Sequence, residues 1–122
     1  MEYILKSNEK EYELPPRNFD MDAKIKEMAS IDFAEAKKEV SREESIRRQF
    51  DFVQMCAPGL LGGDIESVDV NDIISARFDI VEVYEKPARE KRAAAMAEEA
   101  REILYRPEIK RLLALYGLNG KR

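Results

Sequence analysis

Residues 69–85, DVNDIISARFDIVEVYE, are the stretch that decides the fold. Their apolar residues recur with the 3.6-residue period of a helix, as in the i, i+4 pairs Ile74/Phe78 and Ile80/Tyr84. We therefore predict a helix from about residue 70 to 85. The alternative is a strand over residues 80–84, because β-branched side chains are dense there.

This predicted helix is apolar over more than half of its circumference, and Asp69 is placed to cap its start. A helix of that kind is expected near the centre of a fold. The residues expected to pack there are Val70, Ile73, Ile74, Phe78, Ile80, Val81, Val83 and Tyr84.

Two further helices are predicted before this stretch. Ser41 and Glu44 form a capping box at the start of one helix, which Pro58-Gly59 ends. Its apolar face carries Ile46, Phe50, Phe52, Val53, Cys56 and Ala57. An earlier helix contains Met21, Ile25 and Met28 at helical spacing, with Asp20 as its cap. Residues 31–39 between them are a short irregular or helical link.

The C-terminal part also predicts helices. Pro87 suits the first turn of a third long helix, and Pro107 breaks or kinks it before a last one. Their apolar stripe can be ordinary core, or a surface that meets another helix. The residues of that stripe that we predict to bind a partner are Ile103, Leu104, Ile109, Leu112, Leu113 and Tyr116.

The beginning of the chain predicts a β-hairpin. Two β-prone pieces, residues 3–5 and 12–14, flank the turn-prone Ser7-Asn8-Glu9-Lys10, and Pro15-Pro16 stops the second strand. A lone two-stranded hairpin is marginal in water, so it must pack on the body or pair with another chain. We therefore predict self-association by strand addition at Tyr3, Ile4 and Leu5.

Charge is divided unequally along the 122 residues. Residues 1–85 carry 11 Lys+Arg against 20 Asp+Glu, whereas residues 86–122 carry 10 against 5. Two oppositely charged parts can pair with each other, within one chain or between chains, or meet different partners. We predict one mainly α-helical domain over residues 1–122, with a hairpin (1–16), an acidic helical body (20–85) and basic C-terminal helices (86–118).

The composition lacks residues that several classes of protein function require. The chain has no His and a single Cys, Cys56, so the commonest general base is missing and a zinc site lacks ligands. The carboxylate pairs Glu43/Glu44 and Asp69/Asp72 fit helix starts better than catalysis. We expect no enzyme activity, no cofactor and no metal, and a cytoplasmic protein without a membrane span.

Nucleic-acid binding is also disfavoured. Acidic residues are interleaved with the basic residues of the C-terminal part at helix-pairing distances, as in Glu98/Arg101 and Glu108/Arg111. Aromatic residues that could stack on bases are scarce there. A protein partner, or the acidic part of the same chain, fits this basic part better.

The layout resembles the tail assembly chaperones of long-tailed, siphovirus-type bacteriophages and prophages. The resemblance rests on the hairpin from Tyr3-Ile4-Leu5 to Tyr12-Glu13-Leu14-Pro15 and on two segments of the helical body, residues 52–56 and 71–74. It implies that several copies coat the tape-measure protein and keep it soluble during tail assembly. It also implies homo-oligomers and, in some members, a longer frameshifted form. The alternatives are a head–tail connector or another virion assembly protein, and a small DNA-binding regulator.

Overall fold

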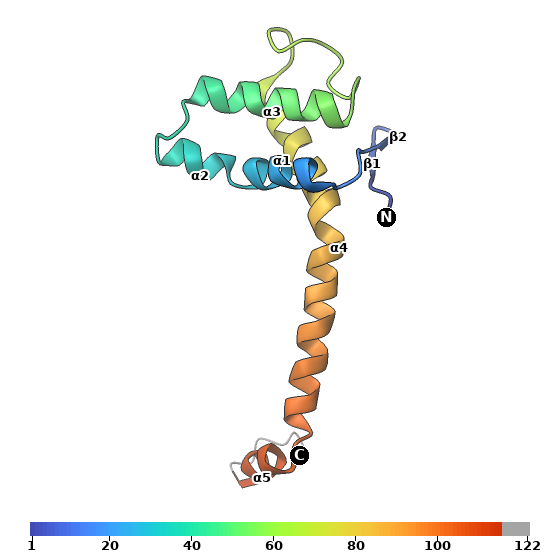
Figure 1. The fold of residues 1–122 in the computed structure, drawn as a ribbon, viewed down its shortest axis with the longest axis vertical. Helices are drawn as coiled ribbons and strands as arrows, with labels where there is room; N and C mark the ends of the chain where they lie inside the picture. The colour runs from blue at the N-terminus through green and yellow to red at the C-terminus, as the bar shows by residue number, and fades with distance from the viewer. Residues whose placement is uncertain (116–122) are drawn as a thin grey trace. The chain divides into compact units, whose positions relative to one another are not determined.

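The structure is a computed structural model, and it describes residues 1–115. An N-terminal two-stranded sheet precedes five helices among these residues (Figure 1). This confirms the predicted mainly α fold with an N-terminal hairpin. The chain divides into two units, Met1–Lys86 and the residues from Pro87 onward. The division falls where the charge of the sequence changes sign.

The hairpin pairs β1 (Ile4–Ser7) with β2 (Lys10–Glu13) in antiparallel register, with Ser7 opposite Lys10. The two turn residues, Asn8 and Glu9, both have positive φ, of 50° and 65°. This is the pattern of a type I′ turn, which matches the twist of two paired strands. The side chain of Leu5 is buried, and it anchors the hairpin to the helices.

Helix α1 (Phe19–Ala29) begins two residues earlier than predicted. Its cap is Asn18, whose Oδ1 accepts a hydrogen bond from the Met21 N–H at 2.9 Å. The predicted cap, Asp20, is therefore wrong, and it lies inside the first turn. Asn18 is in an extended conformation, which frees its side chain to bond forward, whereas a carboxylate in the first turn acts through the helix dipole.

Helices α2 (Ile31–Ala36) and α3 (Arg42–Cys56) follow the sequence prediction. The Ser41 Oγ accepts from the Glu44 N–H at 3.1 Å, which confirms the predicted cap. The predicted apolar face of α3 is buried, including Phe52, Val53 and Cys56. These residues share one core with the hairpin and α1.

Helix α4 (Val70–Leu104) starts where predicted, and it excludes the strand alternative for residues 80–84. Its end was predicted wrongly, because the helix continues through Pro87 instead of restarting there. A proline in a helix interior removes one hydrogen bond and strains its turn, but strong helix formers follow it over residues 88–102. The break predicted at Pro107 is confirmed, since α5 spans Pro107–Leu115.

The buried face of α4 consists of Ile73, Ala76, Arg77, Ile80 and Tyr84. These positions follow helical spacing, so one stripe of the first half of α4 packs into the unit. The prediction placed Val70 and Phe78 in this core, but they are 40% and 51% exposed. The neighbouring Arg77 takes the inward position, because its apolar stem packs and its charged head finds partners.

Arg77 joins three helices from the interior, where it is 1% exposed. Its Nη2 donates to both carboxylate oxygens of Asp32 in α2, at 3.0 and 2.9 Å. Its Nε donates to Gln49 Oε1 in α3 at 3.0 Å, and Nη1 reaches the Met28 carbonyl at 3.4 Å. The guanidinium also lies 3.7 Å from the Phe78 ring centroid. This buried charge is therefore satisfied by both a carboxylate and neutral acceptors.

Tyr84 connects α4 to the hairpin and to the segment that follows it. Its hydroxyl donates to the Pro15 carbonyl at 2.6 Å, and its ring centroid lies 4.7 Å from that of Tyr3. Arg17 donates to the Tyr84 carbonyl at 3.1 Å and pairs with Glu85 at 3.0 Å. The hairpin is thereby packed on the body, as its marginal stability requires.

Candidate protein-binding surfaces

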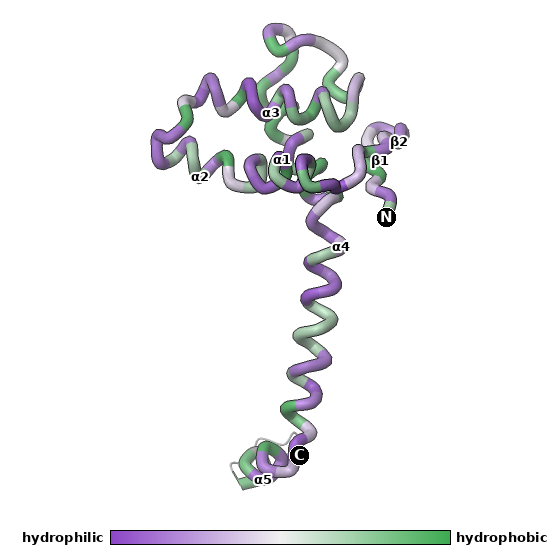
Figure 2. The backbone as a smooth tube through the Cα atoms, in the orientation of Figure 1, coloured by the Kyte–Doolittle hydropathy of each residue, from purple (hydrophilic) through white to green (hydrophobic). Residues whose placement is uncertain are grey.

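The predicted partner-binding residues lie at the end of α4 and in α5. Leu104 is 52% exposed, Leu112 is 49% exposed and Ile103 is 39% exposed, whereas Ile109 is partly buried. Of Leu113 only the helical backbone is described, and Tyr116 lies outside the described residues. Figure 2 shows hydrophobic colour returning at the end of α4 and in α5 after a mostly hydrophilic stretch.

Two residues outside the predicted set add to this apolar surface. Leu115 is 76% exposed and Tyr105 is 65% exposed, and both belong to the same unit. We call the exposed residues Ile103, Leu104, Leu112 and Leu115 the C-terminal apolar set.

The charged side chains near the C-terminal apolar set are exposed to solvent. Glu98 and Arg101 form the predicted helical pair at 3.6 Å, with both side chains 64% exposed. Lys110 lies over the Tyr105 ring at 5.1 Å from its centroid. Such exposed contacts are weak, so these charges remain able to engage a partner.

The predicted self-association residues lie in and just before β1. Leu5 is buried and Tyr3 packs on Tyr84, while Ile4 is partly buried. The side chains of Leu5 and Tyr3 are thus used within the unit. Strand addition at this edge stays a prediction, and it would rest on backbone hydrogen bonds and Ile4.

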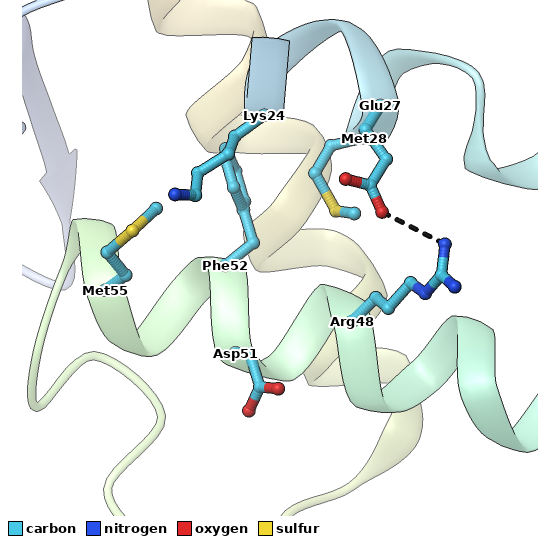
Figure 3. Close-up of a pocket in the computed structure, with 7 residues that line it drawn as sticks. All are labelled: Lys24, Glu27, Met28, Arg48, Asp51, Phe52 and Met55. Carbon is cyan, nitrogen blue, oxygen red and sulfur yellow. Dashed lines mark hydrogen bonds and ion pairs between the residues drawn. The ribbon is translucent and has the colours of Figure 1, made fainter. Parts of the chain in front are cut away.

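Sequence reasoning missed a groove between α1 and α3. Met28 and Phe52 form its buried apolar floor, and Met55, which is 39% exposed, closes one end (Figure 3). Its volume is about 190 Å³. The rim carries the charged residues Lys24, Glu27, Arg48 and Asp51. Helical spacing alone assigned Met28 and Phe52 to the core, and only the packing of two helices shows that a hollow lies above them.

Cys56 has the features of an inert core residue. It is 1% exposed, and burial raises the pKa of its thiol to about 11. The thiol therefore stays protonated near neutral pH, where a nucleophile would need the thiolate.

The carboxylate pairs noted in the sequence serve helix starts and ion pairs. Glu44 accepts from Arg48 at 3.0 Å, and Glu43 from Arg47 at 3.4 Å. The Asp69 carboxylate accepts from the Asn71 N–H at 2.7 Å. Among residues 1–115, no three His, Cys, Asp or Glu side chains are grouped as a metal site would need. The carboxylates of Glu43, Glu44 and Asp69 are therefore engaged in local structure.

Comparison with family models, with curated proteins and with solved structures finds no match to this chain. None of the helices within the described part of the chain is both long and apolar enough to cross a membrane. Any functional assignment therefore rests on the residues and surfaces described above.

Proposed function

We propose that this protein is a non-catalytic tail assembly chaperone of a long-tailed phage or prophage, which binds the tape-measure protein in the host cytoplasm. The observation that supports this proposal most directly is the C-terminal apolar set, exposed on a basic helical unit. A chaperone for a long, aggregation-prone client needs exposed apolar contacts and a charged, soluble surface. Charge complementarity with the client would set register and association rate.

The size of the apolar set argues for several copies on each client. Full burial of a Leu or Ile side chain contributes about 1.5–3 kcal/mol, so each half-exposed residue adds about 1 kcal/mol. Four such residues give about 4 kcal/mol, which corresponds to millimolar affinity even before the entropy of association is subtracted. A single copy therefore binds weakly, and copies that associate with one another gain avidity.

The test is co-expression with the tape-measure protein of the same phage or prophage. We expect the wild-type chain to keep this client soluble and to co-purify with it. The variant I103D/L104D should lose the client while it remains folded, since the two residues are 39% and 52% exposed. Met96→Asp is the matched control, because Met96 is 68% exposed in the same helix but lies outside the predicted residues. Equal client solubility with and without the chain would refute the proposal.

The alternatives give different outcomes in two simple measurements. A head–tail connector or other virion protein would be retained in purified particles, whereas a chaperone would be absent from them. A DNA-binding regulator would bind duplex DNA with an affinity that falls steeply as salt rises.

A further inference from the structure

The α1–α3 groove has the size of a slot for protein side chains. Its volume of about 190 Å³ lies below the range of about 300–1,000 Å³ that is typical of small-molecule sites. Its floor, Met28 and Phe52, is apolar and continuous with the core. Such a hollow accepts one or two aliphatic side chains from a partner rather than a cofactor.

The rim of the groove offers one charge of each sign. Glu27 and Arg48 pair with each other across the groove at 3.2 Å (Figure 3). Lys24 and Asp51 are exposed, and neither forms an ion pair with another residue of the described part of the chain. A partner that fits must therefore present apolar side chains together with a carboxylate and a cation.

One face of α5 has this composition. Glu108, Arg111, Leu112 and Leu115 are spaced at i, i+3, i+4 and i+7, which places them on the same side of a helix. Leu112 and Leu115 are exposed. Within residues 1–115, neither Glu108 nor Arg111 takes part in an ion pair. The face thus carries two apolar anchors and one charge of each sign.

We infer that α5 of a second copy docks in the α1–α3 groove, with Leu112 and Leu115 on its apolar floor. Arg111 then pairs with Asp51, and Glu108 lies toward Lys24. The opposite net charges of residues 1–85 and 86–122 favour the same contact at long range. The contact is head to tail, so a pair of docked copies still has one free groove and one free α5, and the assembly can extend.

The test is a charge reversal on the full chain, with mass measured by sedimentation equilibrium at low salt. Asp51→Arg and Arg111→Asp should each weaken self-association about 3- to 10-fold, and the double variant D51R/R111D should restore it to within about 2-fold. Glu66→Arg is the control, because Glu66 is an exposed acid outside the groove lining. A wild-type chain that stays monomeric at all concentrations would overturn the inference, and so would equal effects of D51R and E66R.

Disulfide trapping shows whether the contact joins different chains. A Met55→Cys chain mixed with a Leu115→Cys chain should give a covalent dimer of one of each, while Cys56 stays unreactive because it is buried. Absence of this mixed dimer, or failure of excess wild-type chain to suppress it, would contradict docking.

This inference does not rest on the proposed client, because the mass is measured on the chain alone. Leu112 and Leu115 belong to both surfaces, so client binding and self-association compete at these two residues. If the wild-type chain self-associates but does not bind the client, only the proposed function is contradicted. If the wild-type chain binds the client but stays monomeric, only the docking of α5 in the groove is contradicted.

Discussion

Asp32→Ala is the most informative single perturbation of this fold. Asp32 is 59% exposed, and an ordinary surface carboxylate contributes about 0–1 kcal/mol to stability. Here the carboxylate holds both bonds of the buried Arg77 Nη2. Removing it leaves a guanidinium that is 1% exposed without its counter-charge, and breaking such a pair costs about 3–5 kcal/mol. We expect a loss near the lower value, about 3 kcal/mol, because water can enter where the carboxylate was.

The double variant D32A/R77M should be more stable than D32A alone. Methionine keeps the apolar stem of Arg77 and removes the unpaired charge, and replacement of a buried ion pair by apolar groups is often neutral. The remaining cost is the Gln49 Oε1, which loses its donor at about 1–3 kcal/mol. The Met28 carbonyl loses only the long contact from Arg77 Nη1, at 3.4 Å.

Urea denaturation followed by circular dichroism measures these differences, provided that the slope with denaturant is unchanged. Asp20→Ala is the control, since Asp20 is exposed and in no ion pair with a described residue. The reasoning is refuted if D32A costs no more than D20A, or if Arg77→Met adds its own full loss on top of D32A.

Three further predictions concern stability. Because Asn18 caps α1, Asn18→Ala should lower the free energy of unfolding by about 1 kcal/mol, and Asp20→Ala should lower it by less. Equal losses in the two variants would contradict the assignment of Asn18 as the cap. Burial raises the pKa of the Cys56 thiol from 9.0 to about 11. The free energy of unfolding should therefore be unaffected by this thiol below about pH 9, and it should fall by about 2–3 kcal/mol as the pH rises to about 11. Cys56→Ala should remove this part of the loss when unfolding is measured at alkaline pH. Pro87→Ala should raise the helix content, and it should raise the free energy of unfolding by up to about 3 kcal/mol. An unchanged free energy of unfolding would show that Pro87 is accommodated without cost.

Local signals made most of the fold predictable. The hairpin needed two β-prone pieces and a polar turn, and α3 needed the Ser41 cap and the Pro58-Gly59 stop. The start of α4 followed from Asp69 and the apolar period. Each of these features depends on residues within a few positions of one another, so the sequence alone carries them.

The error over Phe78 and Arg77 arose because distant residues decide which of them is buried. The helical period and hydrophobicity predict that Phe78 is buried rather than Arg77. They cannot show that Asp32 and Gln49 are positioned to accept hydrogen bonds from a buried guanidinium. Pro87 was expected to begin a helix, yet the strong helix formers that follow it carry α4 past the lost hydrogen bond. A local rule was outweighed in each case by its surroundings.

The candidate surfaces divide in the same way. The exposed Leu104 and Leu112 were identifiable as apolar residues of an amphipathic end, although sequence could not separate core from surface there. The groove required knowledge of how α1 and α3 pack, which no spacing within either helix contains. Recognition of such hollows needs a structure because they are made by two elements.

Helix α4 combines two very different environments along one continuous backbone. Its buried residues all fall between Ile73 and Tyr84, and every residue from Arg89 to Leu104 is exposed. Amide hydrogens in the first part should therefore exchange only when the whole unit opens, whereas those beyond Pro87 should exchange through local fraying. The distal part is thus free to accept sequence changes that the proximal part would not survive, provided that helix propensity and charge are kept.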